Sequence, residues 1–573
     1  MKNVPALLLL LFTHILLNAQ VTARPNMSTV RLATPDKSVI TTVENIESLR
    51  ELSGKPGQVV YLKYHTNAND GGGGHFMWRT SPQFLDANNY FSHDNNGTLI
   101  LANRTNSGRW VRQYEGYIST AYFGANISNA TQSIQNAIDF AWHNQDQNAP
   151  TKGCTVFIPA GTYITDKLTL RNGVQLLGDS HDQTFILPRL PQEGGKEGGY
   201  LFEIDEGVLQ ISVSNLSILG RNIHKGCFHF KAALSASSPN QGGLWFSYFN
   251  KIKIAGFAGH AIFLEGGEGG MLPNQFIVFE LLSIEMSPES PADANALKIT
   301  GQQGQLTFIN TAFNGYNNNM SFHTGHVVDI SHSNDYYSAV ISFINASFQQ
   351  GDYGLYLDYA ENVTVENCWF ENLGVAVTVD GTYHSCQGIN ITGNRFANAA
   401  GYGSLNVSTN NILHGKCIDV INSHVSVTNN YVAVSELTNT SSDDYFITAK
   451  GLNGAINPGI EAYGNSYAYP ELGGTMGITQ TITVSSNTIN CGYNKVMLID
   501  NAYLPVTTIT SSLNAGETLF IKAINGTITF KTGTITLLPH VASLVLNKGE
   551  AATFIKLDNE NGSATYHLMS VLK

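Results

Sequence analysis

The feature that most constrains this chain is a repeated pattern of short alternating apolar runs separated by Asn and Gly. Residues 363–396 read VTVENCWFENLGVAVTVDGTYHSCQGINITGNRF, with runs such as VTV and INI. Such runs are typical of β-strands, and the Asn and Gly breaks are typical of turns. The pattern recurs at loose intervals of roughly 22 to 36 residues, which predicts a solenoid of stacked β-coils with variable loops. The runs end at Phe348, Phe370, Phe396, Val432, Tyr467 and Ile489.

A second regularity lies in the turns. Aligning the runs on that final apolar residue places four Asn residues in one register, two positions earlier: Asn394, Asn430, Asn465 and Asn487. A stacked Asn can hydrogen-bond the turn backbone above and below it, so one residue type recurs along a stack. Earlier turns carry Ala346 and Cys368 there instead. We therefore predict an asparagine ladder, although Asn is also a common turn residue.

The first residues are typical of a secretory signal peptide. Lys2 precedes the apolar run 6–17, and Val-Thr-Ala at 21–23 has the small-residue form of a cleavage site. The run is short for a membrane span, and no later segment is long enough to make one. We expect residues 1–23 to be removed and the mature protein to be secreted, which leaves the periplasm, the medium and the cell surface open.

Charge and cysteine content limit the partners and cofactors. The net charge of -12 argues against nucleic acid or an anionic membrane as the partner. It also argues mildly against a strongly polyanionic glycan, unless calcium or a local basic patch supplies the attraction. The six cysteines show no CxxC or Cys/His metal spacing, so buried free thiols are favoured over disulfides and no metal site is predicted.

Residues 24–114 form a distinct segment. VVYLKYHTNANDGGGGHFMWR at 59–79 predicts a strand, a glycine turn and a second strand, and residues 99–114 continue the rhythm. The four glycines at 71–74 lack the Lys-Ser/Thr and helix that follow a phosphate-binding loop, so a hairpin turn is expected. We interpret this segment as a small β cap on the N-terminal end of the solenoid.

The next segment carries a family resemblance. Residues 130–141 place Ile134, Ile138 and Ala141 on one face of a short amphipathic helix, and a strand with a turn, VFIPAGTYI, follows at 156–164. The order FGA, helix, VFIPAGTY resembles the pectate-lyase-like right-handed β-helix superfamily. The preceding DGGGGHFMWR and GRWVR are similar to the neck region of bacteriophage tailspike depolymerases. One departure is NISN at 126–129, where the family usually has Gly-Asp-Gly after FGA.

The resemblance implies an all-β fold. Residues 115–504 would form a single-stranded right-handed parallel β-helix with an N-terminal capping helix. Members of this family cleave or bind glycans, some by hydrolysis and others by β-elimination, so the resemblance implies a polysaccharide depolymerase but not its chemistry. Many tailspike relatives are homotrimers, which leaves a homotrimer open here.

The rhythm changes after Ile489. Residues 507–573 alternate apolar and polar residues around Asn-Gly and Lys-Gly turns, which predicts a small antiparallel β domain over 505–573. Such a domain would close the end of the solenoid, where an exposed strand edge invites aggregation.

Candidate catalytic residues follow from the strands after the variable loops. Aligning AIFLE, ALKIT, VVDIS, LYLDY, AVTVD and CIDVI gives an inward row and, one residue later, an outward row. In this alignment Lys298, Asp329 and Asp358 stack on successive coils, about 4.8 Å apart. Two carboxylates that close raise one another's proton affinity, which provides one acid and one base at neutral pH. The inward row is Ile262, Leu297, Val328, Leu357, Val377 and Ile418, and the outward row is Phe263, Lys298, Asp329, Asp358, Thr378 and Asp419.

In the resemblance this strand borders the substrate groove, and the preceding loops form one wall. Those loops start near four residues that share another register, Glu285, Asn314, Gln349 and Glu371. We expect Glu371 to lie beside the Asp pair as a fourth catalytic candidate. Tyr356 is a candidate sugar-stacking platform, with packing inside the coil as the alternative. His326 is a candidate base or a solvated loop residue. The substrate-binding candidates are Glu285, His323, His326, Gln349 and Tyr356.

Two enzymatic mechanisms fit the groove. In a hydrolase, one carboxylic acid protonates the glycosidic oxygen and the other carboxylate activates water or attacks the sugar. In a lyase, acidic groups would hold calcium against a uronate and Lys298 would abstract the neighbouring proton. We favour hydrolysis narrowly, because it needs only residues already in register, whereas a lyase needs a more basic neighbourhood.

Two non-catalytic alternatives use the same residues. The protein would be a secreted glycan-binding or adhesion protein if the groove binds without cleaving. Lys298, Asp329 and Asp358 would be plain solvated residues of a strand face if the alignment is shifted, since a one-residue shift exchanges the two faces of a strand.

Overall fold

The computed structural model describes residues 40–572, and the predicted signal peptide lies outside the described residues. The gaps are 126–127, 145–153, 197, 206, 224, 233–241, 268–272, 316, 319–320, 334–335, 398–415, 434–444, 451–458, 464, 468–478, 485–487, 491–495, 503–504, 511–517, 524–525, 534, 538–541 and 559–563. The chain divides into two units, Met1–Thr42 and Val43–Lys573, and the elements described below lie in the second.

A small antiparallel sheet opens this unit. Its strands β2 (Val59–Leu62), β3 (Gly74–Arg79), β5 (Arg109–Arg112) and β4 (Leu99–Ile100) are neighbours in that order, and α2 (Ile46–Arg50) precedes them. Three glycines of the four-glycine stretch lie in the connection from β2 to β3, and the fourth, Gly74, begins β3. There the Asp70 carboxylate accepts hydrogen bonds from the backbone N–H groups of His65 and Gly72. The glycine turn of a hairpin is therefore confirmed.

The predicted amphipathic helix is α3 (Thr131–His143). Its Ile134, Ile138 and Ala141 side chains are fully buried, as their spacing indicated. The strands that open the first coil, β7 (Cys154–Ile158) and β8 (Gly161–Thr165), follow it.

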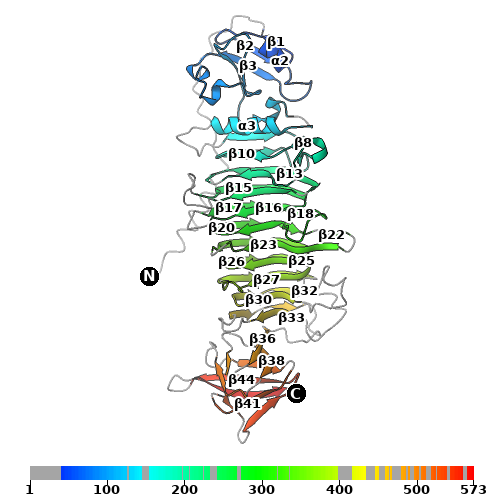
Figure 1. Cartoon of the computed structure of the whole chain (residues 1–573), viewed down its shortest axis with the longest axis vertical. Coiled ribbons are helices and arrows are strands. Elements are labelled where there is room, and N and C mark those ends of the chain that lie inside the picture. Colours follow the sequence, from blue (N-terminus) through cyan, green and yellow to red (C-terminus); the bar gives the residue numbers. More distant parts are fainter. Residues whose placement is uncertain are drawn as a thin grey trace. The chain divides into compact units, whose positions relative to one another are not determined.

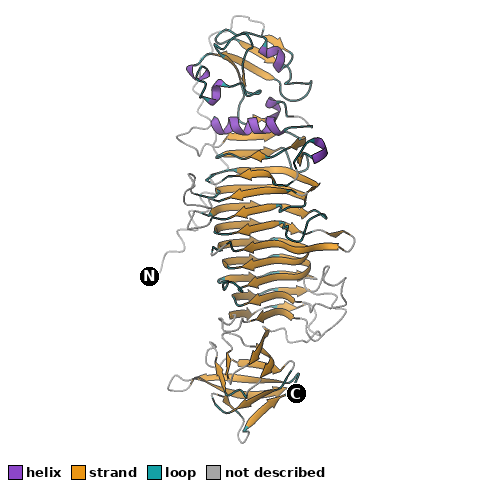
Figure 2. Cartoon of the chain, viewed as in Figure 1, coloured by secondary structure: helices purple, strands orange, loops and turns teal. Residues whose placement is uncertain are grey.

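Strands stacked in parallel form the body of the fold, and each coil contributes to three stacks (Figures 1 and 2). The first stack contains β6 (Ile118–Ser119), β7, β10 (Val174–Gly178), the first half of β13 (Ser212–Ile223), the first half of β15 (Trp245–Phe257), β17 (Asn274–Glu280), β20 (Gln303–Ile309), β24 (Ser338–Ile344), β26 (Ala360–Glu366), β28 (Ile389–Thr392), β31 (His424–Thr428) and β34 (Gly459–Tyr463). The second contains β8, β11 (Thr184–Pro188), the second halves of β13 and β15, β18 (Ser283–Met286), β21 (Ala312–Asn314), the start of β25 (Ser347–Asp358), the start of β27 (Trp369–Asp380), β29 (Arg395–Ala397), β32 (Tyr431–Ala433) and β35 (Ser466–Tyr467).

The third stack carries the candidate site. It contains β9 (Leu168–Thr169), β12 (Tyr200–Ile204), β14 (Gly226–Lys231), β16 (Ile262–Glu265), β19 (Leu297–Thr300), β23 (Ser321–Ser331), the remainder of β25 and β27, β30 (Lys416–Ile421), β33 (Tyr445–Lys450), β36 (Thr479–Val484) and β38 (Val496–Ala502). This all-parallel arrangement confirms the predicted parallel β-helix.

Inward-facing side chains form the core, and parallel pairing makes each of them meet its counterpart on the next coil. The final apolar residues of the repeat pair as predicted, from Phe348 through Phe370 and Phe396 to Val432 and Tyr467. The Phe370 ring stacks on Phe348 at 4.7 Å and on Phe396 at 4.9 Å between ring centroids, and all three rings are fully buried. Such offset aromatic contacts add to the free energy of burial.

The asparagine ladder is present over the described turns. The backbone N–H and Nδ2 of Asn394 donate to Oδ1 of Asn430 at 2.9 and 3.0 Å, and Asn430 donates likewise to Asn465 at 2.9 Å in both bonds. Asn487 lies outside the described residues. The residue just before each ladder position has the left-handed φ that Asn and Gly tolerate best. These residues are Asn345 (φ 52°), Asn367 (53°), Gly393 (67°) and Asn429 (56°).

Antiparallel strands follow the β-helix toward the C-terminus. β40 (Thr518–Ala523) pairs with β44 (Ala551–Asp558), which pairs with β45 (Ala564–Leu572), and β41 (Ile528–Lys531) pairs with β43 (Ser543–Leu546). The domain boundary at residue 505 stays a prediction.

Among the described residues, no helix has the length and apolarity needed to cross a membrane. Four of the described cysteines are free thiols: Cys154, Cys227, Cys368 and Cys386.

Candidate active site

The first part of the predicted outward row is correct. Phe263 pairs with Lys298 across β16 and β19, and Lys298 pairs with Asp329 across β19 and β23. Because these strands are parallel and in register, the two charged side chains leave the same face. The Lys298 ammonium group donates to Asp329 Oδ2 at 2.7 Å and to Ser331 Oγ at 2.9 Å.

The predicted stacking of Asp358 on Asp329 is wrong by two residues. Asp329 pairs with Tyr356 of β25, and Asp358 pairs with Asp380 at the end of β27. The inward row shifts in the same way, since Val328 pairs with Leu355 rather than Leu357. A strand spacing of about 4.8 Å and a rise of about 3.3 Å per residue put the Cα atoms of Asp329 and Asp358 about 8 Å apart. The two carboxylates therefore face the same way as diagonal neighbours.

Asp358 is held in a setting that favours its protonated form. Its Oδ2 lies 2.6 Å from Nδ1 of His332, whose ring stacks on Tyr383 at 4.2 Å between centroids. Burial is the main cause that raises the pKa of Asp358 above its ordinary value. The hydrogen bond and the charge of His332 lower this pKa, and the negative charges of Asp380 and Asp329 raise it by smaller amounts; burial together with these two charges outweighs His332.

Asp329 is held in a setting that favours its ionised form. Burial acts to raise its pKa, but His326 and Lys298 together outweigh burial, so the pKa of Asp329 lies below its ordinary value. His326 Nδ1 lies 3.7 Å from Asp329 Oδ2. The other oxygen, Oδ1, is enclosed and has no hydrogen-bond partner among the described residues. The Asp329 and Asp358 side chains are 14% and 13% exposed, so both reach the surface but are mostly enclosed.

Tyr356 lies among the three carboxylates. Its hydroxyl donates to Asp380 Oδ2 at 3.0 Å, and its ring stacks on His326 at 4.3 Å with an interplanar angle of 2°. Burial, followed by the charges of Asp380, Asp358 and Asp329, raises the pKa of the Tyr356 hydroxyl far above its ordinary value. The phenol is therefore neutral. Tyr356 and His326, both expected as substrate-binding residues, lie in the candidate site.

His323 does not line the surface as expected. Its side chain is fully buried, and burial lowers its pKa to about 4. A Cβ added at Gly315 or at Gly325 would lie 3.0 Å from atoms of His323, so the two glycines let the backbone close around the ring. In this structure the His323 ring is a packed interior group.

Glu371 does not lie beside the Asp pair. The predicted register of Glu285, Asn314, Gln349 and Glu371 is correct, but these residues belong to the second stack. Glu371 is the third residue of β27 and Asp380 is the last, so they stand at opposite ends of one long strand. Glu285 and Gln349 also belong to the second stack, whereas Asp329 and Asp358 belong to the third. The Glu371 carboxylate accepts a hydrogen bond from Trp369 Nε1 at 3.2 Å.

Asp380 was missed in the sequence as a partner of Asp358. It ends the run AVTVD, and its position as the final outward residue of an aligned run was a signal for it. Its Oδ1 accepts from the backbone N–H of Thr382 at 2.9 Å, so it also anchors the following turn. The contact between Asp358 and His332 had no sequence signal, because His332 lies beyond the end of β23.

The donor set around these carboxylates does not resemble a calcium site. Calcium takes 6–8 oxygen ligands, whereas the Asp329, Asp358 and Asp380 carboxylates contact ammonium, imidazole and phenol groups. Among the described residues, no group of three or more His, Cys, Asp or Glu side chains is placed to hold a metal ion.

Two protein-family models match this chain. Residues 42–115 match the phage tail protein small four-stranded beta-sheet domain, and residues 117–192 match the rhamnogalacturonase A/epimerase, pectate lyase-like family. The first match contains β2, β3, β5 and β4, and the second runs from β6 through α3 to β11. No curated protein sequence matches the chain.

Solved phage tailspikes share the fold. The gp42 tailspike of Acinetobacter phage vb_AbaP_AS12 has a TM-score of 0.52 and 12% sequence identity over 94% of this chain and 93% of that chain. Tailspike protein 2 of Escherichia coli O157:H7 bacteriophage CAB120 has a TM-score of 0.49 and 13% identity over 93% of this chain and 72% of that chain. Only the first similarity is strong enough to define the fold.

These findings define the fold and the likeness of two segments. Residues 42–115 are similar to a phage-tail β-sheet domain, and residues 117–192 are similar to a pectate lyase-like family. The fold is like that of a solved phage tailspike, which confirms the predicted resemblance at the level of the fold.

Proposed function

We propose that this protein is an extracellular polysaccharide depolymerase that hydrolyses glycosidic bonds on the face of β23, β25 and β27. One observation carries the proposal: Asp329 and Asp358 share this face, and their surroundings shift their pKa values in opposite directions. Two carboxyl groups whose pKa values are shifted apart in this way supply the acid and the base of glycoside hydrolysis. The match to a family named for rhamnogalacturonase and pectate lyase supports a glycan as the substrate.

The two carboxyl groups take different roles. Asp358, whose pKa is raised, protonates the oxygen of the leaving sugar. Asp329, whose pKa is lowered, acts as the ionised base. The separation of the two carboxyl groups sets the outcome at the anomeric carbon: about 5 Å suits retention, and a wider separation, which leaves room for the attacking water, suits inversion.

Hydrolysis is better supported than β-elimination. The Lys298 ammonium group donates to Asp329 and Ser331, so it is engaged as a cation rather than presented as a base. The surrounding charges are mainly acidic, since Asp329, Asp358 and Asp380 all lie near Tyr356. Such a surface disfavours the uronate substrate that elimination requires.

A digest of a glycan panel tests the proposal. The full-length protein is compared with its Asp358→Asn and Asp329→Asn variants, and each sample is assayed for new reducing ends and for ultraviolet absorbance from unsaturated uronates. We expect reducing ends without absorbance, and a loss of about 10²–10⁴ in rate for each variant. Glu366→Gln on β26 is the control carboxylate and should leave the rate unchanged.

Other results would overturn this function. Absorbance together with reducing ends would indicate a lyase, in which Lys298 becomes the candidate base. An inactive parent protein that still binds glycan would indicate an adhesion protein. Activity retained in both Asp variants would move the catalytic site away from this face.

The assembly and location of the protein belong to the same proposal. The tailspike resemblance leaves a homotrimer possible, and the pattern of residues 1–23 predicts secretion. Both fit a protein that meets polysaccharide outside a cell.

A further inference from the structure

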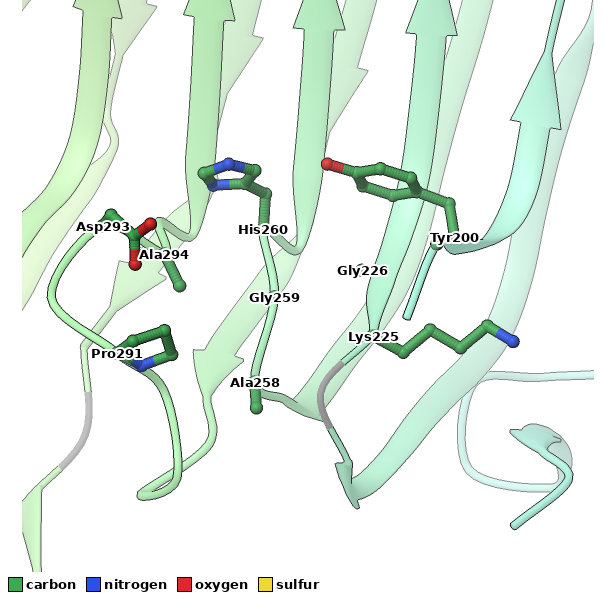
Figure 3. A pocket seen from close by; sticks show the side chains of 10 residues that line it. Tyr200, Lys225, Gly226, Ala258, Gly259, His260, Pro291, Asp293 and Ala294 are labelled. Carbon is green, nitrogen blue, oxygen red and sulfur yellow. The ribbon is translucent and has the colours of Figure 1, made fainter. Parts of the chain in front are cut away.

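A pocket of about 240 Å³ lies where strands of the third stack begin (Figure 3). Tyr200 and Gly226 start β12 and β14, and His260 precedes β16. A Cβ at Gly226 would lie 2.2 Å from Tyr200 Cε1, and one at Gly259 would lie 2.9 Å from the Gly226 backbone nitrogen. The two glycines therefore let bare backbone form the floor of the pocket.

The His260 ring brings a neutral imidazole to the pocket. Its Nδ1 and the Oδ1 of Asn295 are both enclosed, and the Asn295 side chain interacts with the His260 ring. Burial first, and then the charge of Lys298, lowers the pKa of His260 to about 4, so the imidazole is neutral at neutral pH. A neutral imidazole has one donor and one acceptor, which suits an uncharged hydroxyl group as its partner.

The other polar groups of the pocket suit an uncharged ligand. Figure 3 shows the Tyr200 hydroxyl directed toward the His260 side, whereas the Lys225 ammonium end points away from it. The exposed Asp293 carboxylate stands on the far wall, and its charge reaches the His260 ring. Imidazole, phenol and carboxylate together accept and donate hydrogen bonds to hydroxyl groups, and the carboxylate repels anions.

Aromatic side chains connect this pocket with the candidate active site. The Tyr200 ring lies 4.6 Å from His229, which stacks on Phe263 at 4.9 Å with an interplanar angle of 7°. Phe263 is in register with Lys298 and Asp329 on the next two coils. Two coil spacings are about 10 Å, so one extended chain could occupy the pocket and the active site together.

We propose that this pocket is a subsite that binds one neutral glycosyl unit of the polysaccharide, on the same face as the Asp329–Asp358 site. The inference rests on the proposed function, because it assigns the unit to the same glycan. A sugar ring presents hydroxyl groups to His260 and Tyr200 and an apolar face to the aromatic row. A pocket of about 240 Å³ is small among ligand sites, which suits a single unit.

Binding of small glycosides tests the subsite without any turnover. Saturation-transfer NMR on the full-length protein uses methyl glycosides of glucose, galactose, mannose, rhamnose and the two N-acetylhexosamines, with methyl glucuronoside as the acidic probe. We expect at least one neutral glycoside to bind, and the His260→Ala and Tyr200→Phe variants to bind it about tenfold more weakly. Asp293→Asn should strengthen binding of the glucuronoside.

Matched controls carry the same changes elsewhere. His75→Ala and Tyr117→Phe alter exposed side chains of the same types outside the pocket and should leave binding unchanged. Tyr200→Phe keeps the ring and removes only the hydroxyl, so it tests the subsite even if His260→Ala fails to fold.

The outcomes separate the two proposals. If the parent protein cleaves a glycan, His260→Ala should raise KM and leave kcat unchanged, since the lost contact is remote from the reacting bond. Glycoside binding that depends on His260 and Tyr200 in a protein without turnover would support the subsite and contradict the hydrolase. No binding of any neutral glycoside, or binding that both variants leave unchanged, would overturn the subsite.

Discussion

At the level of single residues, two neighbours of Asp358 act on its proton in opposite directions. The charge of Asp380 raises the pKa of Asp358, whereas the hydrogen bond from His332 lowers it. For a general acid, activity is lost as pH rises through its pKa. The alkaline limb of the pH–rate profile therefore reports the pKa of Asp358, which Asp380 and His332 shift in opposite directions.

Two substitutions should move this limb in opposite directions. Asp380→Asn removes a negative charge, so the pKa of Asp358 falls and the limb moves to lower pH. His332→Gln removes a group that lowers the pKa, so the limb moves to higher pH. The measurement is kcat/KM against pH for both variants and the parent. If the alkaline limb of kcat/KM has the same pH midpoint in all three proteins, Asp358 is not the general acid.

The residues of the site were predicted from the sequence only in part. Lys298 and Asp329 were aligned correctly because each lies within three residues of the end of its strand, so the turn that follows marks the register. The alignment failed at Asp358, because β25 continues for 12 residues through a bend and Leu355 and Leu357 both face inward. A shift of two residues preserves the alternation of faces, so the pattern of apolar residues cannot detect it.

At the level of elements, the asparagine ladder joins the turns of successive coils. Asn430 is fully buried; its Nδ2 donates to the backbone oxygen of Ile391 at 3.0 Å, and its Oδ1 accepts two hydrogen bonds from Asn394. Removing the side chain leaves these buried partners unsatisfied.

Asn430→Ala should lower the free energy of unfolding by about 2 kcal/mol. The matched control is Asn390→Ala on the outward face of β28, where the side chain is exposed and the cost should stay within about 0.5 kcal/mol. Thermal unfolding and amide hydrogen exchange of both variants measure the difference. Equal midpoints for the two variants would mean that the ladder adds little to the stability of the stack.

At the level of the whole molecule, the tailspike resemblance predicts a defined assembly. Light scattering of the full-length protein over a range of concentrations should give about three times the mass of one chain, because cyclic homo-oligomers are closed assemblies. A monomer mass at all concentrations would remove the homotrimer from the proposal. The candidate site lies on one chain, so a monomer would leave the proposed hydrolase intact.

The N-terminus offers a second test at this scale. Residues 1–23 predict cleavage after Ala23 and export, whereas residues 42–115 match a phage-tail domain. N-terminal sequencing of the protein from its natural source should begin at Arg24. A chain that begins at Met1 or Lys2 would contradict the signal peptide and favour delivery as part of a virion.

The sequence by itself determined the parallel β-helix, the capping helix, the asparagine ladder and the row from Phe263 to Asp329. Each of these follows from a local period or a turn residue, and the pattern repeats often enough to align. Only the tertiary structure decided that Asp358 pairs with Asp380, that His323 is buried and that Tyr200 and His260 share a pocket. These contacts depend on where a strand bends and on how closely the backbone packs at glycine. Neither the bend nor the close packing alters the alternation of apolar and polar residues, so the sequence pattern does not reveal them.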